Sequence, residues 1–167
     1  MKGWEEEVQH PVFVKYLQNQ GFKEKISFFH EHNLNIDNFR NNAKRSRPDF
    51  VIVHPQCLEL VECKNGNHPS YQLAQAIGEL LIYRSLIELK YPDIPKRHII
   101  RLSICMIDGY ESKNGHDEWT IDHDKLVKNI EKIIHEKIGI YLVQPKSGKK
   151  AKQYWKDEEC QEVIVHK

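Results

Sequence analysis

The sequence predicts an α/β protein in which helices flank a mixed central sheet. Apolar residues recur at helical spacing in three segments, two strand-like segments flank a short turn, and another segment alternates between apolar and polar residues. The order helix, hairpin, helix, strand, helix, strand is typical of an α/β sandwich. The chain has 167 residues, of which 40% are hydrophobic and 29% are charged, so it is large enough for one domain with a packed core.

A first helix is expected over about residues 4–20, where apolar residues form one stripe. Pro11 would either start the regular helix or kink it, because an interior proline removes a backbone donor. Gly21 would end the helix. Residues 23–47 combine phenylalanines, which favour burial, with several asparagines, which favour turns, and we assign no regular element to them.

Residues 49–54 and 57–64 are predicted to be two strands of a hairpin joined by the turn Pro55-Gln56. A two-residue turn sets the register, so that the numbers of every facing pair have the same sum. Asp49 would then face Glu62. Facing side chains lie about 4.5–5.5 Å apart, where like charges are destabilising, so the two acids require a nearby cation.

Helices and strands alternate in the second half of the chain. Apolar residues at helical spacing predict a helix over residues 70–90, and alternation predicts a strand over residues 98–108. Thr120 or Asp122 can cap a third helix, which Gly139 would end. The remaining strands are expected over residues 140–143 and 162–166.

The hairpin also brings together residues that can carry chemistry. Lys64 lies two residues beyond Glu62 and therefore projects to the same face of the strand. With Asp49, the predicted site has two carboxylates and one ammonium group. Carboxylate oxygens suit Mg²⁺, which polarises phosphoryl oxygens and lowers the pKa of a bound water. Because an ammonium group can also neutralise charge that develops on a phosphate, the site suits phosphodiester hydrolysis.

Pro48-Asp49, followed after a strand and a turn by Glu62-Cys63-Lys64, resembles the motif of the PD-(D/E)XK nuclease superfamily, which has the restriction-endonuclease-like fold. Residues 72–83 resemble the glutamine-bearing helix that follows the active-site strand in many members. The element order is similar to the α-β-β-β-α-β core of the family, although only two of its first three strands are assigned. The likeness covers residues 4–108 of a single domain, and residues 109–167 would be peripheral.

The resemblance implies a role for each motif residue. Asp49 and Glu62 would bind the metal, and the backbone carbonyl of Cys63 could supply a third ligand. Lys64 would be the catalytic lysine. The implied cofactor is Mg²⁺, for which Mn²⁺ could substitute.

Two further roles are implied outside the hairpin. Gln75 would approach the scissile phosphate or water, with Gln72 as the alternative. A glutamate of the first helix would lie near the metal, and Glu7, or else Glu6, is the candidate. His10 occupies the position that a shorter helix would give this glutamate.

Several of these patterns have ordinary alternatives. Gln75 and Glu79 are one helical turn apart and fit a simple hydrogen-bonded pair. Glu88-Leu89-Lys90 repeats the E-x-K spacing at a helix end, and Asp93 with Glu111-Ser112-Lys113 repeats the whole motif. The second full copy is predicted to lie in loops, whereas adjacent strands hold a triad more firmly, so the first copy is favoured.

The histidines suggest a less favoured alternative. His30 and His32 could bind zinc with Cys57 or Cys63, but the closely spaced ligand pairs of zinc sites are absent from the sequence. The other histidines near the predicted site are expected to be polar surface or turn residues: His10, His54 and His68.

The distribution of charge bears on the partner. With 25 Lys and Arg against 24 Asp and Glu, the net charge of +1 excludes a uniformly basic surface. Residues 40–47 and 146–156 nevertheless form two basic runs without acids, which could follow a nucleic-acid backbone. The residues singled out for this contact are Arg45, Arg47, Lys149 and Lys150.

These observations predict an Mg²⁺-dependent deoxyribonuclease, an endonuclease rather than an exonuclease. The alternatives are a non-catalytic nucleic-acid-binding or partner-binding module on the same fold, and a catalytic subunit that needs a separate specificity partner. Symmetric cuts in both strands would require a homodimer. With no secretory signal and no apolar run of about 18 residues, we expect a cytoplasmic protein without a membrane partner.

Overall fold

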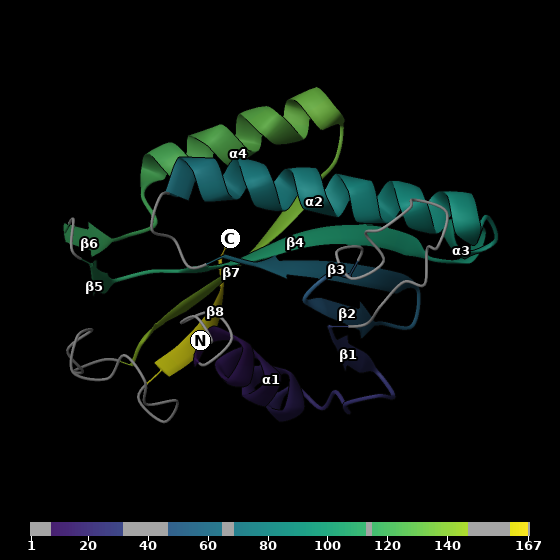
Figure 1. The fold of residues 1–167 in the computed structure, drawn as a ribbon, viewed down its shortest axis with the longest axis horizontal. Coiled ribbons are helices and arrows are strands. Elements are labelled where there is room, and N and C mark those ends of the chain that lie inside the picture. The colour runs from purple at the N-terminus through teal and green to yellow at the C-terminus, as the bar shows by residue number, and fades with distance from the viewer. Residues whose placement is uncertain (1–7, 32–46, 65–68, 113–114, 147–160, 167) are drawn as a thin grey trace, which may run out of the picture.

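A six-stranded sheet forms the centre of the protein and carries helices on both faces (Figure 1). The computed structural model describes residues 8–31, 47–64, 69–112, 115–146 and 161–166. The helices within these ranges are α1 (His10–Asn19), α2 (Pro69–Lys90), α3 (Ile94–Arg97) and α4 (Ile121–Ile134). The strands are β1 (Phe28–His30), β2 (Phe50–Val53), β3 (Cys57–Cys63), β4 (Ile99–Ile107), β5 (Tyr110–Ser112), β6 (Gly115–Asp117), β7 (Ile138–Pro145) and β8 (Gln161–His166).

The strand order of the main sheet is β1-β2-β3-β4-β7-β8. Its three central strands, β3, β4 and β7, are parallel, and the pairs at both edges are antiparallel. β5 and β6 form a separate two-stranded sheet. The predicted fold class, an α/β protein with a mixed central sheet, is therefore confirmed.

The hairpin has the register that its two-residue turn predicts. Val53 pairs with Leu58 and Val51 pairs with Leu60, and the backbone N–H of His54 donates to the carbonyl of Cys57 at 2.8 Å. β2 begins at Phe50, so Asp49 lies immediately before the strand rather than inside it. This position leaves its carboxylate at the end of the sheet.

Three of the described strands were not predicted: β1, β5 and β6. The prediction that Glu111 lies in a loop is therefore wrong, because Glu111 belongs to β5, which pairs with β6. β1 belongs to the main sheet. Its three residues pair with β2 in antiparallel register. A segment of three residues is too short to display a period of two, so pairing with a neighbour is what defines it as a strand. With β1, the order from α1 to β4 is one helix, three strands, two helices and one strand.

The ends of the helices differ partly from the predictions. Pro11 lies in the first turn of α1, where its missing N–H costs least, and the π-helical residues Val8 and Gln9 precede that turn. Thr120 caps α4, as predicted, in a capping box with His123. The prediction that Gly139 ends α4 is wrong, because the helix ends at Ile134 and its C-cap is His135, whose φ is 57°.

Gly139 lies inside β7, where the close approach of β4 explains the glycine. A Cβ atom at this position would lie 2.4 Å from Oγ and 3.2 Å from Cβ of Ser103. Ser103 Oγ cannot turn away without loss, since it donates a 2.6 Å hydrogen bond to the buried carboxylate of Glu59. The glycine therefore permits a polar contact in the interior of the sheet.

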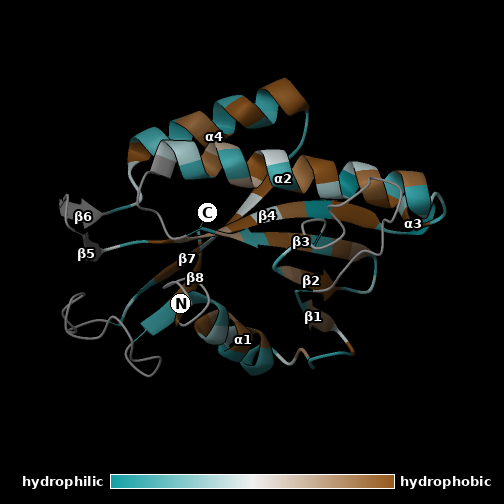
Figure 2. Cartoon of the chain, viewed as in Figure 1, coloured by the Kyte–Doolittle hydropathy of each residue, from teal (hydrophilic) through white to brown (hydrophobic). Residues whose placement is uncertain are grey.

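The sheet separates two hydrophobic cores. One lies against α2 and α4, and the other lies against α1. Successive residues of β2 alternate between them: Phe50 and Ile52 face α1, whereas Val51 faces α2. Figure 2 shows predominantly hydrophobic central strands, while α4 alternates between hydrophobic and hydrophilic residues. Burial on both faces is typical of central parallel strands.

No helix among the described residues is long and apolar enough to cross a membrane.

The packing at Gly139 leads to a test of stability. Gly139→Ala should lower the free energy of unfolding by about 1–3 kcal/mol, the usual cost of overpacking an interior. Urea denaturation followed by circular dichroism measures this change. Gly78→Ala in α2 is the matched control, because a Cβ atom there meets nothing within 4 Å. Equal stability of Gly139→Ala and the wild-type protein would contradict the proposed contact.

Candidate active site

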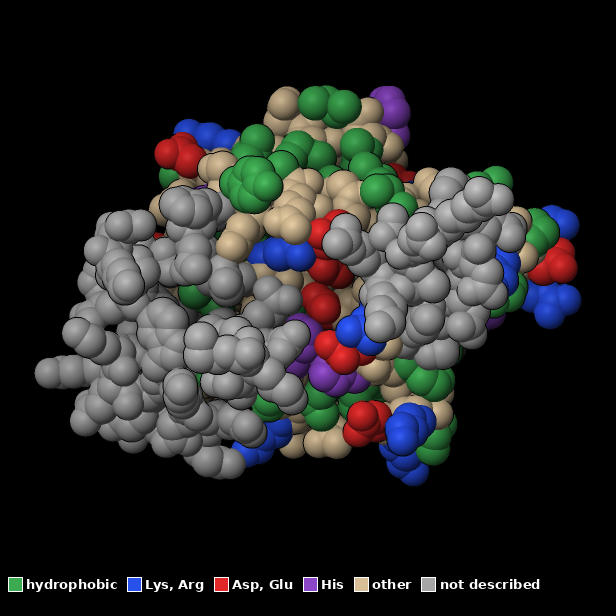
Figure 3. Space-filling view, in the orientation of Figure 1, with side chains coloured by type: hydrophobic (Ala, Val, Ile, Leu, Met, Phe, Trp, Pro, Cys, Tyr) green, Lys and Arg blue, Asp and Glu red, His purple; other side chains and the backbone are tan. Residues whose placement is uncertain are grey.

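The predicted motif lies at the carboxyl end of the parallel strands. Glu62 is near the end of β3, and Lys64 follows that strand directly. Asp49 reaches the same end because β2 runs antiparallel to β3. Ligands of α/β proteins commonly bind outside the carboxyl ends of the strands. Figure 3 shows acidic, basic and histidine side chains gathered at the centre of one face.

Lys64 connects two acids from different elements. Its Nζ donates to Oε1 of Glu62 and to Oε2 of Glu79, both at 3.0 Å. The side chains of Lys64 and Glu62 are only 12% and 7% exposed, so this ion pair is poorly screened by solvent. The second ion pair, between Lys64 and Glu79, joins the end of β3 to α2.

Asp49 reaches this cluster through the backbone of the same strand. Its Oδ2 accepts a 2.7 Å hydrogen bond from the backbone N–H of Cys63. It also lies close enough to act electrostatically on the other two residues, since Lys64 lowers its pKa and its own charge raises the pKa of Glu62. The three motif residues therefore lie together in the folded chain.

Burial and excess negative charge shift the pKa values in this cluster. Desolvation is the main cause that raises the pKa of Asp49 and of Glu62, and neighbouring carboxylates add to it. Desolvation opposes the charge of Lys64, but its acidic partners outweigh this effect and raise its pKa above the ordinary value. Lys64 therefore stays protonated at neutral pH.

The donor set fits a hard divalent cation. Glu62 and Glu79 contact the ammonium group of Lys64, and Asp49 acts on it electrostatically, so the cluster has excess negative charge when all three carboxylates are ionised. The oxygens of the three carboxylates do not all lie within 4.8 Å of one another, so one ion would need a movement of these side chains to contact all three. Oε2 of Glu62 is buried and has no hydrogen-bond partner among the described residues. A buried carboxylate oxygen without a donor favours either a proton or a metal ion. Carboxylate oxygens of this kind suit Mg²⁺ or Mn²⁺.

α2 contributes more to the site than predicted. Gln75 is exposed, and its Nε2 donates to Oε1 of Glu79 at 3.0 Å. The pair expected from the sequence therefore forms, and Glu79 in turn binds Lys64. Gln75 reaches the motif through Glu79. The contact of Glu79 with Lys64 depends on how α2 packs against the sheet. The spacing of residues along the helix does not predict this packing.

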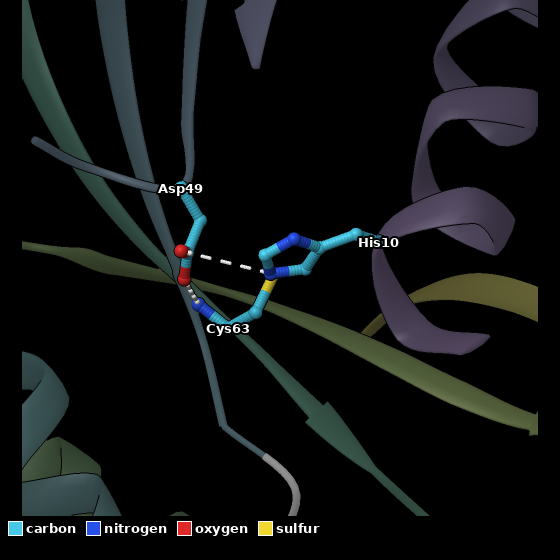
Figure 4. Close-up of side chains that lie close together, drawn as sticks. All are labelled: His10, Asp49 and Cys63. Atoms are coloured by element: carbon cyan, nitrogen blue, oxygen red, sulfur yellow. Dashed lines mark hydrogen bonds and ion pairs between the residues drawn. The ribbon is translucent and has the colours of Figure 1, made fainter. Parts of the chain in front are cut away.

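The start of α1 supplies residues that sequence reasoning missed. Nε2 of Gln9 donates to the carbonyls of Lys64 and Cys105, at 3.1 and 2.9 Å. These bonds fasten the start of α1 to the ends of β3 and β4. The next residue, His10, is 2% exposed, and its Nε2 lies 3.6 Å from Oδ1 of Asp49 (Figure 4).

The expectation that His10 is a surface or turn residue is therefore wrong. Its one signal in the sequence was its position where a shorter helix would place a glutamate. His54 is also more than a turn residue, because its Nε2 lies 2.8 Å from Oε2 of Glu59. Glu59 belongs to a separate buried network on the α1 face of the sheet, where the hydroxyls of Ser103 and Tyr141 also donate to it.

The second copy of the motif does not converge. Asp93 precedes α3 and pairs with Lys96 at 3.3 Å, whereas Glu111 lies in β5. The nine residues of β4 stand between them, which corresponds to roughly 30 Å of strand. Lys113 lies outside the described residues. The choice of the first copy agrees with this separation.

The basic candidates are mostly beyond the described residues. Arg47 is described, half-exposed, and its Nη2 lies 4.0 Å from Oε2 of Glu31. The other candidates for nucleic-acid or metal contact lie outside the described ranges: Glu6, Glu7, Arg45, Lys149 and Lys150.

No family model, curated protein or solved structure matches the chain. The geometry of the site is therefore the basis for the function proposed below.

The raised pKa values predict how stability depends on pH without divalent ions. A carboxyl group whose pKa is raised on folding stabilises the folded chain fully below its ordinary pKa, about 4, and this contribution is lost as the pH rises through the folded pKa. Asp49→Asn, which cannot ionise, should avoid part of this loss. In EDTA, the free energy of unfolding of Asp49→Asn minus that of the wild-type protein should increase as the pH rises from about 4 to about 8.

Urea titrations at each pH measure this difference. His10 is present in both proteins, and its contribution has the opposite sign, because burial lowers its pKa to about 3 and its contribution is lost as the pH falls. Mg²⁺ at the highest pH should restore stability to the wild-type protein. A difference that stays constant across the range would contradict a raised pKa of Asp49.

Proposed function

We propose that the protein is a metal-dependent nuclease that hydrolyses phosphodiester bonds, with DNA as the favoured substrate and endonucleolytic cleavage as the favoured mode. The observation that carries this proposal is the position of the Lys64 ammonium between Glu62 and Glu79, beside Asp49. The observed order of helices and strands also supports a restriction-endonuclease-like core of the PD-(D/E)XK type.

Asp49 and Glu62 would hold the metal in this proposal. When bound, Mg²⁺ or Mn²⁺ would polarise the phosphoryl oxygen and lower the pKa of a water molecule. Asp49 is oriented by the backbone N–H of Cys63, and Glu62 is oriented by Lys64. Both carboxylates are therefore held in place before a ligand arrives, which reduces the cost of binding.

Lys64 acts as a cation and not as a base. Its raised pKa keeps three N–H donors on Nζ, of which two point to Glu62 and Glu79. The remaining donor can orient a water molecule or stabilise negative charge that develops on the phosphate. Glu79 positions the ammonium group, and Gln75 in turn holds Glu79.

Single substitutions test this proposal. Lys64→Ala and Glu62→Gln should each reduce cleavage at least about 100-fold, because each removes a charge that acts on the reacting phosphate or on the metal. The assay mixes the purified protein with plasmid, linear, single-stranded and branched DNA in Mg²⁺. Glu59→Gln, on the same strand but in the separate network, and Lys90→Ala, in the repeated E-x-K triplet, are the matched controls and should retain activity.

Undiminished cleavage by Lys64→Ala would refute the assignment. A non-catalytic binding module on the same fold would show neither strand scission nor stabilisation by Mg²⁺. A catalytic subunit that requires a specificity partner would be stabilised by Mg²⁺ in an Asp49-dependent manner and would cleave only after the partner is added. Sedimentation with and without DNA would show whether cleavage accompanies dimer formation.

The positioning role of Glu79 gives a separate prediction. Glu79→Gln keeps the size of the side chain but removes one of the two anions that hold Lys64. We expect kcat to fall about 10-fold with little change in KM, as for other supporting contacts around an active group. Glu88→Gln is the control, because that acid lies on the same helix and pairs with Arg84 instead. An equal fall in both variants would indicate a general effect on α2.

A further inference from the structure

A second group of potential ligands lies beside the motif on the α1 face of the sheet. It consists of His10 from the start of α1, Asp49 from the start of β2 and Cys63 from the end of β3. One ligand atom from each residue lies within 4.8 Å of the other two. Figure 4 shows the imidazole, the carboxylate and the thiol directed toward one another. The sequence had suggested the backbone carbonyl of Cys63 as a ligand of the catalytic metal, and its sulfur only in a less favoured zinc site with His30 and His32.

The imidazole of His10 is held by a second histidine on the side away from Asp49. Its Nδ1 lies 2.8 Å from Nε2 of His30, and the ring of His30 stacks on Phe50 with ring centroids 4.8 Å apart. In the tautomer that donates from Nδ1 of His10 to His30, Nε2 of His10 carries the lone pair, and this atom lies 3.6 Å from Oδ1 of Asp49. Metal-binding histidines commonly use their other ring nitrogen in this way. Gln9 fixes the adjacent backbone by its bonds to the strand ends.

The distances suit a tetrahedral ion. With metal–nitrogen and metal–oxygen bonds of about 2.0 Å and a metal–sulfur bond of about 2.3 Å, ligand atoms lie about 3.3–3.6 Å apart. The 3.6 Å separation of His10 Nε2 and Asp49 Oδ1 already agrees with this value. A water molecule would supply the fourth ligand. The ligand atom of Cys63 lies within 4.8 Å of those of His10 and Asp49, so a small movement of the thiol would bring its sulfur to bonding distance from the ion.

The donor set selects a different metal from that of the motif. Thiolate and imidazole ligands favour Zn²⁺ and similar ions, whereas Mg²⁺ prefers oxygen ligands only. The two sites share Asp49. An ion bound by His10 and Cys63 would thus hold the carboxylate that the motif needs for its own ion.

We propose that His10, Asp49 and Cys63 form a Zn²⁺ site whose occupation inhibits the nuclease by taking Asp49 from the catalytic metal. Zn²⁺ displaces the proton of the Cys63 thiol to solvent and binds the thiolate, the imidazole and one carboxylate oxygen. The inhibitory consequence rests on the function proposed above, whereas metal binding does not. His30 orients His10 from outside the ligand set.

Spectroscopy of the metal-free full-length protein with Co²⁺ as the probe tests the ligand set. The wild-type protein should develop the near-ultraviolet band of a cobalt–thiolate bond. Cys63→Ser and Cys63→Ala should lose this band. Cys105→Ser is the matched control, because Cys105 is equally buried and pairs with Cys63 across β3 and β4. The control should keep the band.

Competition with Zn²⁺ then measures affinity. His30→Ala should weaken binding about 10–100-fold, the usual effect of losing an outer hydrogen-bond partner, and His10→Ala should weaken it further. A thiolate band that persists in Cys63→Ser, or that disappears only in Cys105→Ser, would overturn the proposal. Zn²⁺ affinity that is insensitive to His10→Ala would also overturn it.

A nuclease assay tests the inhibition separately. The rate of each protein is compared with its own rate in Mg²⁺ alone. Added Zn²⁺ should lower this relative rate for the wild-type protein at concentrations that do not lower it for Cys63→Ser. If no cleavage is found in any protein while the cobalt band depends on Cys63, the nuclease proposal fails and the metal site stands. If cleavage is found but Zn²⁺ inhibits Cys63→Ser and the wild-type protein equally, the inhibitory site is refuted.

Discussion

The ion pair of Lys64 with Glu62 and Glu79 is the interaction on which the rest of the site depends. Without the ammonium group, the negative charges of these acids would be unbalanced, although the side chains of Glu62 and Asp49 are only 7% and 15% exposed. Breaking a buried ion pair by removing one partner commonly costs about 3–5 kcal/mol, because the remaining charge stays buried. The ion pair with Glu79 also joins the end of β3 to α2, two elements that pack together in the same hydrophobic core.

Asp49 occupies an unusual place between the two faces of the sheet. Because β2 begins one residue later, its carboxylate lies at the strand end and can act toward either side. On one side it shares the electrostatic field of Glu62 and Lys64, and on the other it approaches His10. The bond from the Cys63 amide holds it at this position. One residue thereby connects the chemistry of two otherwise separate layers.

Local geometry explains which part of the site was predictable. The turn Pro55-Gln56 determines the hairpin register, and the pleat places Lys64 on the face of Glu62, so both follow from positions along the chain. His10 and Glu79 come from helices whose placement depends on packing against the sheet. No pattern within either helix contains that information. β1 escaped prediction for a related reason, since its three residues become a strand only by pairing with β2.

The packing of α1 against β7 and β8 has a consequence for biosynthesis. The core beneath this helix includes Val143 of β7, and Val163 of β8 packs against it. The core beneath α1 is therefore complete only after β7 and β8 have been made. Gln9 and His10 lie at the start of this helix, so their contacts with the strand ends also form late. On the ribosome, a growing polypeptide therefore cannot complete this side of the site before β7 and β8 have emerged.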